Sequence, residues 1–166
     1  MLKLNYRIEV LKMKKFAVEN INDIINWFLF QQPMTHKKLQ KMLYFSYGIY
    51  LVENNKNCEN INDCLFTNRF EAWVHGPVDP LVYQIYKNSG INLISKETCN
   101  ENMLGKKVLK VLERTMEIYS KYDADELEEI THNQIPWKNA RKGLAPWEAS
   151  NNPILDKDIY LAFLEN

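Results

Sequence analysis

The histidines and cysteines of this 166-residue chain are the residues from which a metal site would be built. His36, His75 and His132 lie far apart in the sequence, and no HExxH motif accompanies them. Cys58 and Cys64 are separated by five residues, a wider spacing than structural zinc motifs use for paired cysteines. The spacing therefore predicts that the chain binds no metal, and we expect no other cofactor.

A nucleophilic enzyme would need a serine elbow or a thiol beside an imidazole. The chain has no GxSxG motif, and its five glycines form neither of the glycine-rich loops that hold phosphate. One alternative is a hydrolase or transferase in which Cys58, Cys64 or Cys99 meets His75 or His132 in space. The odd number and irregular spacing of the cysteines favour reduced loop thiols in a cytoplasmic protein, so we expect no catalytic residue.

The overall charge argues against a nucleic-acid partner. Lys+Arg and Asp+Glu both number 21, so the formal net charge is zero and no global field attracts phosphate. No apolar run approaches the roughly 20 residues that cross a bilayer. The opening MLKLNYRIEVLK lacks the continuous apolar centre of a signal peptide, which again predicts a cytoplasmic protein without membrane contact.

The apolar periodicity predicts a mainly α fold, a compact single-domain bundle of six to seven helices with a small two- or three-stranded antiparallel sheet. We assign residues 13–166 to this domain and residues 1–12 to an N-terminal extension, which starts upstream of Met13 or forms a short basic arm. Residue types suited to helix starts are Thr35, Asp79 and Asp123. Helices are predicted at 18–32, 36–50, 80–89, 103–122, 124–130, 136–142 and 154–164.

Residues 65–74 alternate between apolar and polar side chains, which predicts a strand. Its expected antiparallel partner is the segment 91–97. Lys37, Lys38 and Lys41 gather at the start of the second helix, and form either a solvated basic face or a contact surface for an acidic partner.

Three segments place tryptophan beside proline: AWVHGPVDP, THNQIPW and APWEAS. Such segments are either packing at chain reversals or a recognition surface. Gly76 precedes a proline, which indicates a bend that a side chain at this position would disturb. His75, at the edge of the bend, either fixes the turn or faces a partner.

Three longer segments stand out: MTHKKLQKMLYFSYGIYLV, FEAWVHGPVDPLVYQIYKNSG and ITHNQIPWKNARKG. Their order and separation resemble the Panacea domain of SocA-like antitoxins, a family that also includes GepA-type phage-associated proteins. The resemblance covers roughly residues 16–164. Asp79, Pro80 and Leu81 stand where many relatives have Pro-x-Val, a departure that keeps the helix start.

The resemblance implies a mostly helical protein that is not an enzyme and neutralises a cognate toxin by direct protein–protein binding. It also implies, as a second partner in some members, a Clp-type protease to which the toxin is handed. Alternatives within the binding class are a phage-borne protease adaptor and a binder of a host defence protein.

Large aromatic side chains and arginine dominate the binding energy of many protein interfaces. We therefore expect the partner-binding residues to come from the aromatic, histidine and basic side chains of the three motifs. These candidates are Lys38, Lys41, Tyr44, Trp73, His75, Tyr83, His132, Trp137 and Arg141.

Overall fold

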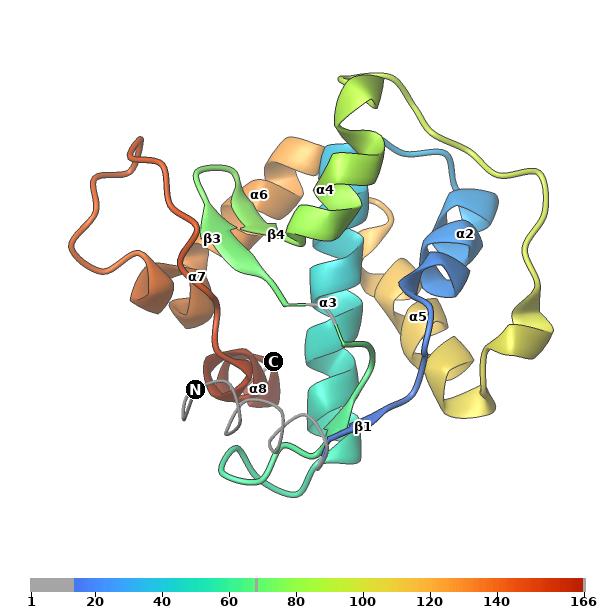
Figure 1. Ribbon diagram of the computed structural model, residues 1–166, viewed down its shortest axis with the longest axis horizontal. Helices are drawn as coiled ribbons and strands as arrows, with labels where there is room; N and C mark the ends of the chain where they lie inside the picture. The colour runs from blue at the N-terminus through green and yellow to red at the C-terminus, as the bar shows by residue number, and fades with distance from the viewer. Residues whose placement is uncertain (1–13, 68, 166) are drawn as a thin grey trace, which may run out of the picture.

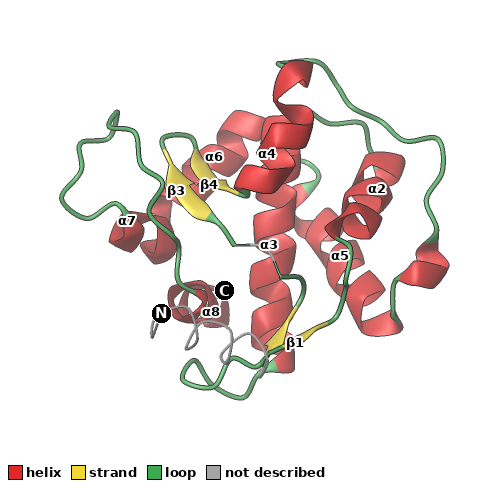
Figure 2. Cartoon of the chain, viewed as in Figure 1, coloured by secondary structure: helices red, strands yellow, loops and turns green. Residues whose placement is uncertain are grey.

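The computed structural model describes residues 14–67 and 69–165, and the predicted extension 1–12 lies outside these ranges. Within them the chain is mainly α, which confirms the predicted fold class. Figure 2 shows the helices together with a few short strands. The described residues form seven α-helices: α2 (Ile21–Gln31), α3 (His36–Asn54), α4 (Pro80–Tyr86), α5 (Lys106–Tyr119), α6 (Ala124–Asn133), α7 (Ile135–Ala140) and α8 (Asp156–Leu164).

Helix α3 forms the centre of the molecule. Every residue from Lys38 to Leu51 is buried, as expected for a helix that is covered on all sides. Figure 1 shows α2 and α5 on one side of α3, and α6, α7 and a β-hairpin on the other. Helix α8 packs against the second half of α3. No helix in the described ranges is both long enough and apolar enough to cross a membrane.

The helix starts follow local capping chemistry. The hydroxyl of Thr35 accepts a hydrogen bond from the backbone N–H of Lys38 at 3.2 Å. Asp79 caps α4, whose first residue is a proline, and Asp123 forms a capping box with Glu126. The acidic residues after Asp123 therefore begin a helix, as their position in the sequence predicts.

The strands form two separate pairs. β1 (Lys15–Phe16) is parallel to β2 (Asp63–Cys64), and β3 (Glu71–Trp73) is antiparallel to β4 (Gly76–Val78). The predicted pairing of the strand at 65–74 with 91–97 is wrong. Gly76 has a φ of +95°, so the chain reverses directly after Trp73 and β3 meets its partner at once. In the segment 91–97, Ile94 instead forms a single bridge with Met34.

The crossing of α3 and α8 requires a glycine. A Cβ added at Gly48 would lie far inside van der Waals contact with the ring of Phe163. We expect Gly48→Ala to lower the free energy of unfolding by about 2 kcal/mol, because the ring must leave its packed position. Urea unfolding followed by circular dichroism measures this loss.

Gly105→Ala is the matched control, because nothing lies within 4 Å of a Cβ at Gly105 and its φ is negative. Adding Phe163→Leu to Gly48→Ala should recover part of the loss. Equal stability of Gly48→Ala and wild type would contradict the close packing of α3 on α8.

Candidate functional site

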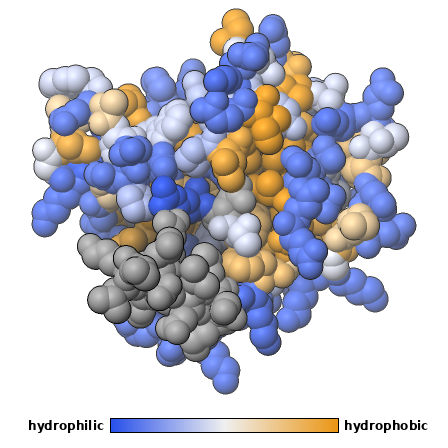
Figure 3. Space-filling model, in the orientation of Figure 1, coloured by the Kyte–Doolittle hydropathy of each residue, from blue (hydrophilic) through white to orange (hydrophobic). Residues whose placement is uncertain are grey.

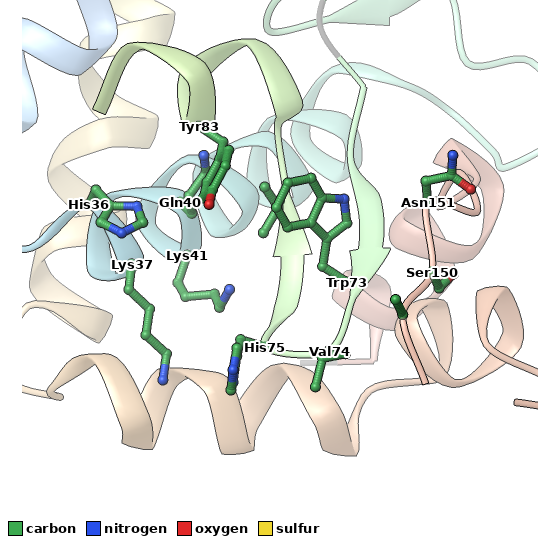
Figure 4. Close-up of a pocket in the computed structure, with 12 residues that line it drawn as sticks. His36, Lys37, Gln40, Lys41, Trp73, Val74, His75, Tyr83, Ser150 and Asn151 are labelled. Atoms are coloured by element: carbon green, nitrogen blue, oxygen red, sulfur yellow. The ribbon is translucent and has the colours of Figure 1, made fainter. Parts of the chain in front are cut away.

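A cavity of about 750 Å³ opens beside the N-terminal half of α3. Its walls come from α3, the β3–β4 hairpin, the start of α4 and a segment of the loop before α8 (Figure 4). The lining residues are His36, Lys37, Gln40, Lys41, Trp73, Val74, His75, Val78, Tyr83, Ala149, Ser150 and Asn151.

Two side chains of α3 hold the second strand of the hairpin. The Gln40 amide donates to the backbone carbonyl of Asp79 at 3.1 Å and accepts from its N–H at 2.8 Å. The Lys41 ammonium donates to the carbonyl of Pro77 at 3.1 Å. These buried bonds fix β4 and the start of α4 to the central helix.

Helix α7 and the residue after it hold the first strand. The indole N–H of Trp137 donates to the carbonyl of Trp73 at 2.9 Å. The Arg141 guanidinium donates to the carbonyl of Ala72 at 2.9 Å, and also to the carbonyls of Ala145 and Glu148 in the following loop. The hairpin is thus clamped between α3 and α7, and Arg141 ties the loop to the same point.

Glu128 of α6 gathers basic side chains at the rim of the cavity. It forms an ion pair with Lys37, and its carboxylate lies 3.1 Å from Nδ1 of His75 and 3.9 Å from Nε2 of His132. Burial alone would raise the pKa of Glu128, but the hydrogen bonds and charges of Lys37 and His75 outweigh it and lower that pKa. Glu128 is therefore ionised near neutral pH.

Lys41 is 1% exposed, an unusual position for a lysine. Burial lowers the pKa of its ammonium to about 7, although the nearby charge of Glu128 opposes this shift. Lys41 therefore titrates near physiological pH, and a charged group placed beside it would shift the balance between its charged and neutral forms.

The prediction of a solvated basic face at the start of α3 is wrong. Lys38 is buried and donates to the carbonyl of Ser120 at 2.7 Å, while Lys37 pairs with Asp125 and Glu128. The acidic first turns of α6 pack over this end of α3, so the same chain supplies the counter-charges.

The candidate partner-binding residues occupy different depths. Trp73, His75 and Tyr83 line the cavity and reach the surface, with His75 the most exposed. His132 and Trp137 are half-buried and stack on each other with ring centroids 4.0 Å apart. That any of these five residues contacts a partner remains a prediction. The buried candidates are Lys38, Lys41, Tyr44 and Arg141.

One family of known proteins matches a range that covers much of this site. Residues 39–138 match the family described as Antitoxin SocA-like, Panacea domain. The chain belongs to this family. The resemblance that the three motifs suggested is confirmed, and the matched range of the Panacea domain contains the hairpin, α4, α6 and the Gln40 and Lys41 contacts.

A curated relative is Antitoxin SocA of Caulobacter vibrioides (strain NA1000 / CB15N), which is 33% identical over 72 residues. This match covers 43% of the chain and 35% of the relative, so it spans about a third of the length of that protein. No solved structure matches the chain.

The chain also exposes apolar side chains near this site, and the two on α4 were not among the sequence-based candidates. Leu81 and Ile85 of α4 are 67% and 56% exposed, and Trp147 of the APWEAS segment, in the loop between α7 and α8, is 80% exposed. Figure 3 shows apolar surface on this face gathered between α4 and α2. The two α4 residues are four apart on one helix face, a spacing that could have indicated them.

The three cysteines lie away from the cavity lining. Cys64, on β2, is buried near Lys14, Tyr47 and Asp156, and burial followed by the Asp156 charge raises the pKa of its thiol. A raised pKa disfavours the thiolate that a nucleophile needs. Within the described ranges no group of three or more His, Cys, Asp or Glu side chains is placed to hold a metal ion.

Proposed function

We propose that this Panacea domain is the antitoxin of a toxin–antitoxin system and neutralises a cognate toxin protein by direct binding. Family membership over residues 39–138 is the observation that carries the proposal. The surface around the cavity is the proposed centre of the interface.

The geometry supports this choice of surface. The hairpin backbone is held from both sides by buried and half-buried hydrogen bonds, so the positions from which its side chains extend are set before a partner arrives. Pre-fixed side chains lose little conformational entropy on binding. Half-buried Trp73 and Tyr83 pack edge to face with centroids 4.7 Å apart, and Leu81 of α4 and Trp147 of the loop before α8 are exposed on elements that contribute to the cavity walls.

We expect Trp73→Ala and Tyr83→Ala each to weaken toxin binding by about 2 kcal/mol, which is roughly 30-fold in Kd. The test co-expresses the chain with the product of a neighbouring gene that is toxic alone, and measures rescue of growth and the Kd of the purified pair. Leu161→Ala, an exposed leucine on α8, is the matched control. Unchanged binding by folded variants would contradict this surface.

The half-life of the toxin separates two modes of neutralisation. A toxin that persists beside the antitoxin is blocked by the contact alone. A toxin that disappears only in cells with an active Clp-type protease is being handed over for degradation. Absence of any toxic partner whose effect the chain relieves would contradict the antitoxin function itself.

A further inference from the structure

The charged residues and the histidines that line the cavity beside α3 are all basic. Two lysines and two histidines contribute to it, Lys37, Lys41, His36 and His75, and no aspartate or glutamate does. Glu128, at the rim, is already engaged by Lys37 and His75. The charges that line the cavity therefore favour an anion.

Few of these groups have spare hydrogen-bonding capacity. Both ends of the Gln40 amide are used by Asp79, and Lys37 is paired with Asp125 and Glu128. The Lys41 ammonium has three N–H donors, and among the described residues only the Pro77 carbonyl accepts from it. Lys41 is thus the cation with capacity left.

His36 adds a second unused group. Its Nδ1 is buried and has no hydrogen-bond partner in the described part of the chain. Burial and the nearby charge of Lys41 lower the pKa of the ring, so the imidazole is neutral near pH 7 and can donate from one nitrogen. Figure 4 shows His36 and Lys41 extending from the same helix on the cavity side.

Much of the remaining lining is apolar, and the polar exceptions are Ser150 and Asn151 of the loop before α8. Trp73 and Tyr83 form one wall, and Val74 and Val78 continue it. An occupant that suits both the basic groups and the apolar lining of the cavity carries one negative group on an aromatic or aliphatic body. Several phosphate groups would be poorly matched, because one unpaired lysine cannot balance them and no arginine lines the cavity.

We infer that the cavity receives a single carboxylate next to an apolar side chain, supplied by an acidic segment of the protein partner. This inference rests on the proposed antitoxin function. A protein source fits better than a free acid, because exposed Leu81 and Trp147 on the surrounding elements would stay uncovered by a small molecule.

The first test uses the purified full chain with two probes, N-acetyl-phenylalanine and its amide, followed by the NMR signal of the Trp73 indole. The probes differ only in the carboxylate. We expect the acid to bind about ten-fold tighter than the amide, as a charge-assisted hydrogen bond would give. Equal binding of the two probes, or tighter binding of ATP than of the acid, would overturn the inference.

Variants assign the preference to Lys41. Lys41→Met should reduce the ratio of the Kd for the amide to the Kd for the acid to less than about two. Lys106→Met, which removes an exposed lysine on α5, should leave this ratio unchanged. The comparison of the two probes on wild type decides the matter even where Lys41→Met does not fold.

The second test uses the cognate toxin, with each Asp and Glu changed in turn to Asn and Gln. We expect one such change to raise the Kd about ten-fold with the wild-type antitoxin and less than about two-fold with Lys41→Met. A toxin that binds without depending on any acid overturns the inference and leaves the antitoxin function intact. If the acid probe binds selectively but no toxin partner exists, the proposed antitoxin function is contradicted. The proposal that a protein partner supplies the carboxylate is then contradicted as well.

Discussion

Replacement of Gly76 by alanine is expected to lower the free energy of unfolding by at least about 3 kcal/mol. The φ of +95° at this position is strained for any residue with a Cβ. The added Cβ would also lie 2.7 Å from the Thr131 hydroxyl and 3.0 Å from the end of the Lys41 side chain. Backbone strain and overpacking each cost about 1–3 kcal/mol.

Gly143→Ala separates the two contributions. Gly143 has a φ of +87°, but nothing lies within 4 Å of a Cβ built there. It should show the backbone cost alone, about 1 kcal/mol. Urea unfolding of wild type and both variants gives the comparison. Equal losses for Gly76→Ala and Gly143→Ala would show that the hairpin does not press against α3 and α6 as described.

This expected loss bears on the function. Gly76 lies where Thr131 and Lys41 approach the hairpin, and Trp137 holds its other strand. These residues all belong to the motifs on which the family resemblance depends. The motifs therefore encode chiefly the clamp that holds the hairpin, and the outward side chains of Trp73 and Tyr83 are available for recognition. Under the proposed antitoxin function, a variant that loosens the clamp should weaken toxin binding without removing any of the proposed contact residues.

The helices could be predicted from the sequence because their signals are local. Thr35, Asp79 and Asp123 lie within three residues of the N–H groups that they cap. The strand pairing was mispredicted because the decisive feature, a positive φ at Gly76, permits a much tighter reversal than the distance to 91–97 suggested. The helix signals depend on residues that are close in the sequence, whereas the strand pairing depended on the backbone angle of a single glycine.

The cavity was harder to predict for a related reason. The aromatic segments that form it could be identified, but which of their side chains face outward depends on contacts between distant residues. Lys41 is buried because Pro77 and Glu128 meet it from β4 and α6, far along the chain. Arg141 is buried because the Ala72 carbonyl lies opposite it. Neither contact has a signal in the local sequence.

The buried Lys41 should make stability depend on pH in an unusual direction. Its pKa falls from an ordinary value of 10.5 to about 7 in the folded chain. Between these values the unfolded chain holds a proton that the folded chain has released, so the free energy of unfolding rises with pH across this window. The full effect is about 5 kcal/mol. The charged or titratable groups around the ammonium are His36, Lys37, Glu128 and His132.

Lys41→Met should remove this pH dependence. At pH 6 the variant avoids the cost of a buried charge but leaves the Pro77 carbonyl without its donor, a loss of about 1–3 kcal/mol. We therefore expect it to be more stable than wild type by about 2 kcal/mol at pH 6 and less stable at pH 10, where the wild-type amine is neutral and keeps its hydrogen bond. Urea unfolding at pH 6, 8 and 10 measures the crossing, with Lys106→Met as the control. Parallel curves for wild type and Lys41→Met would mean that the ammonium keeps its proton in the folded chain, and that its charge is balanced more fully than Glu128 alone allows.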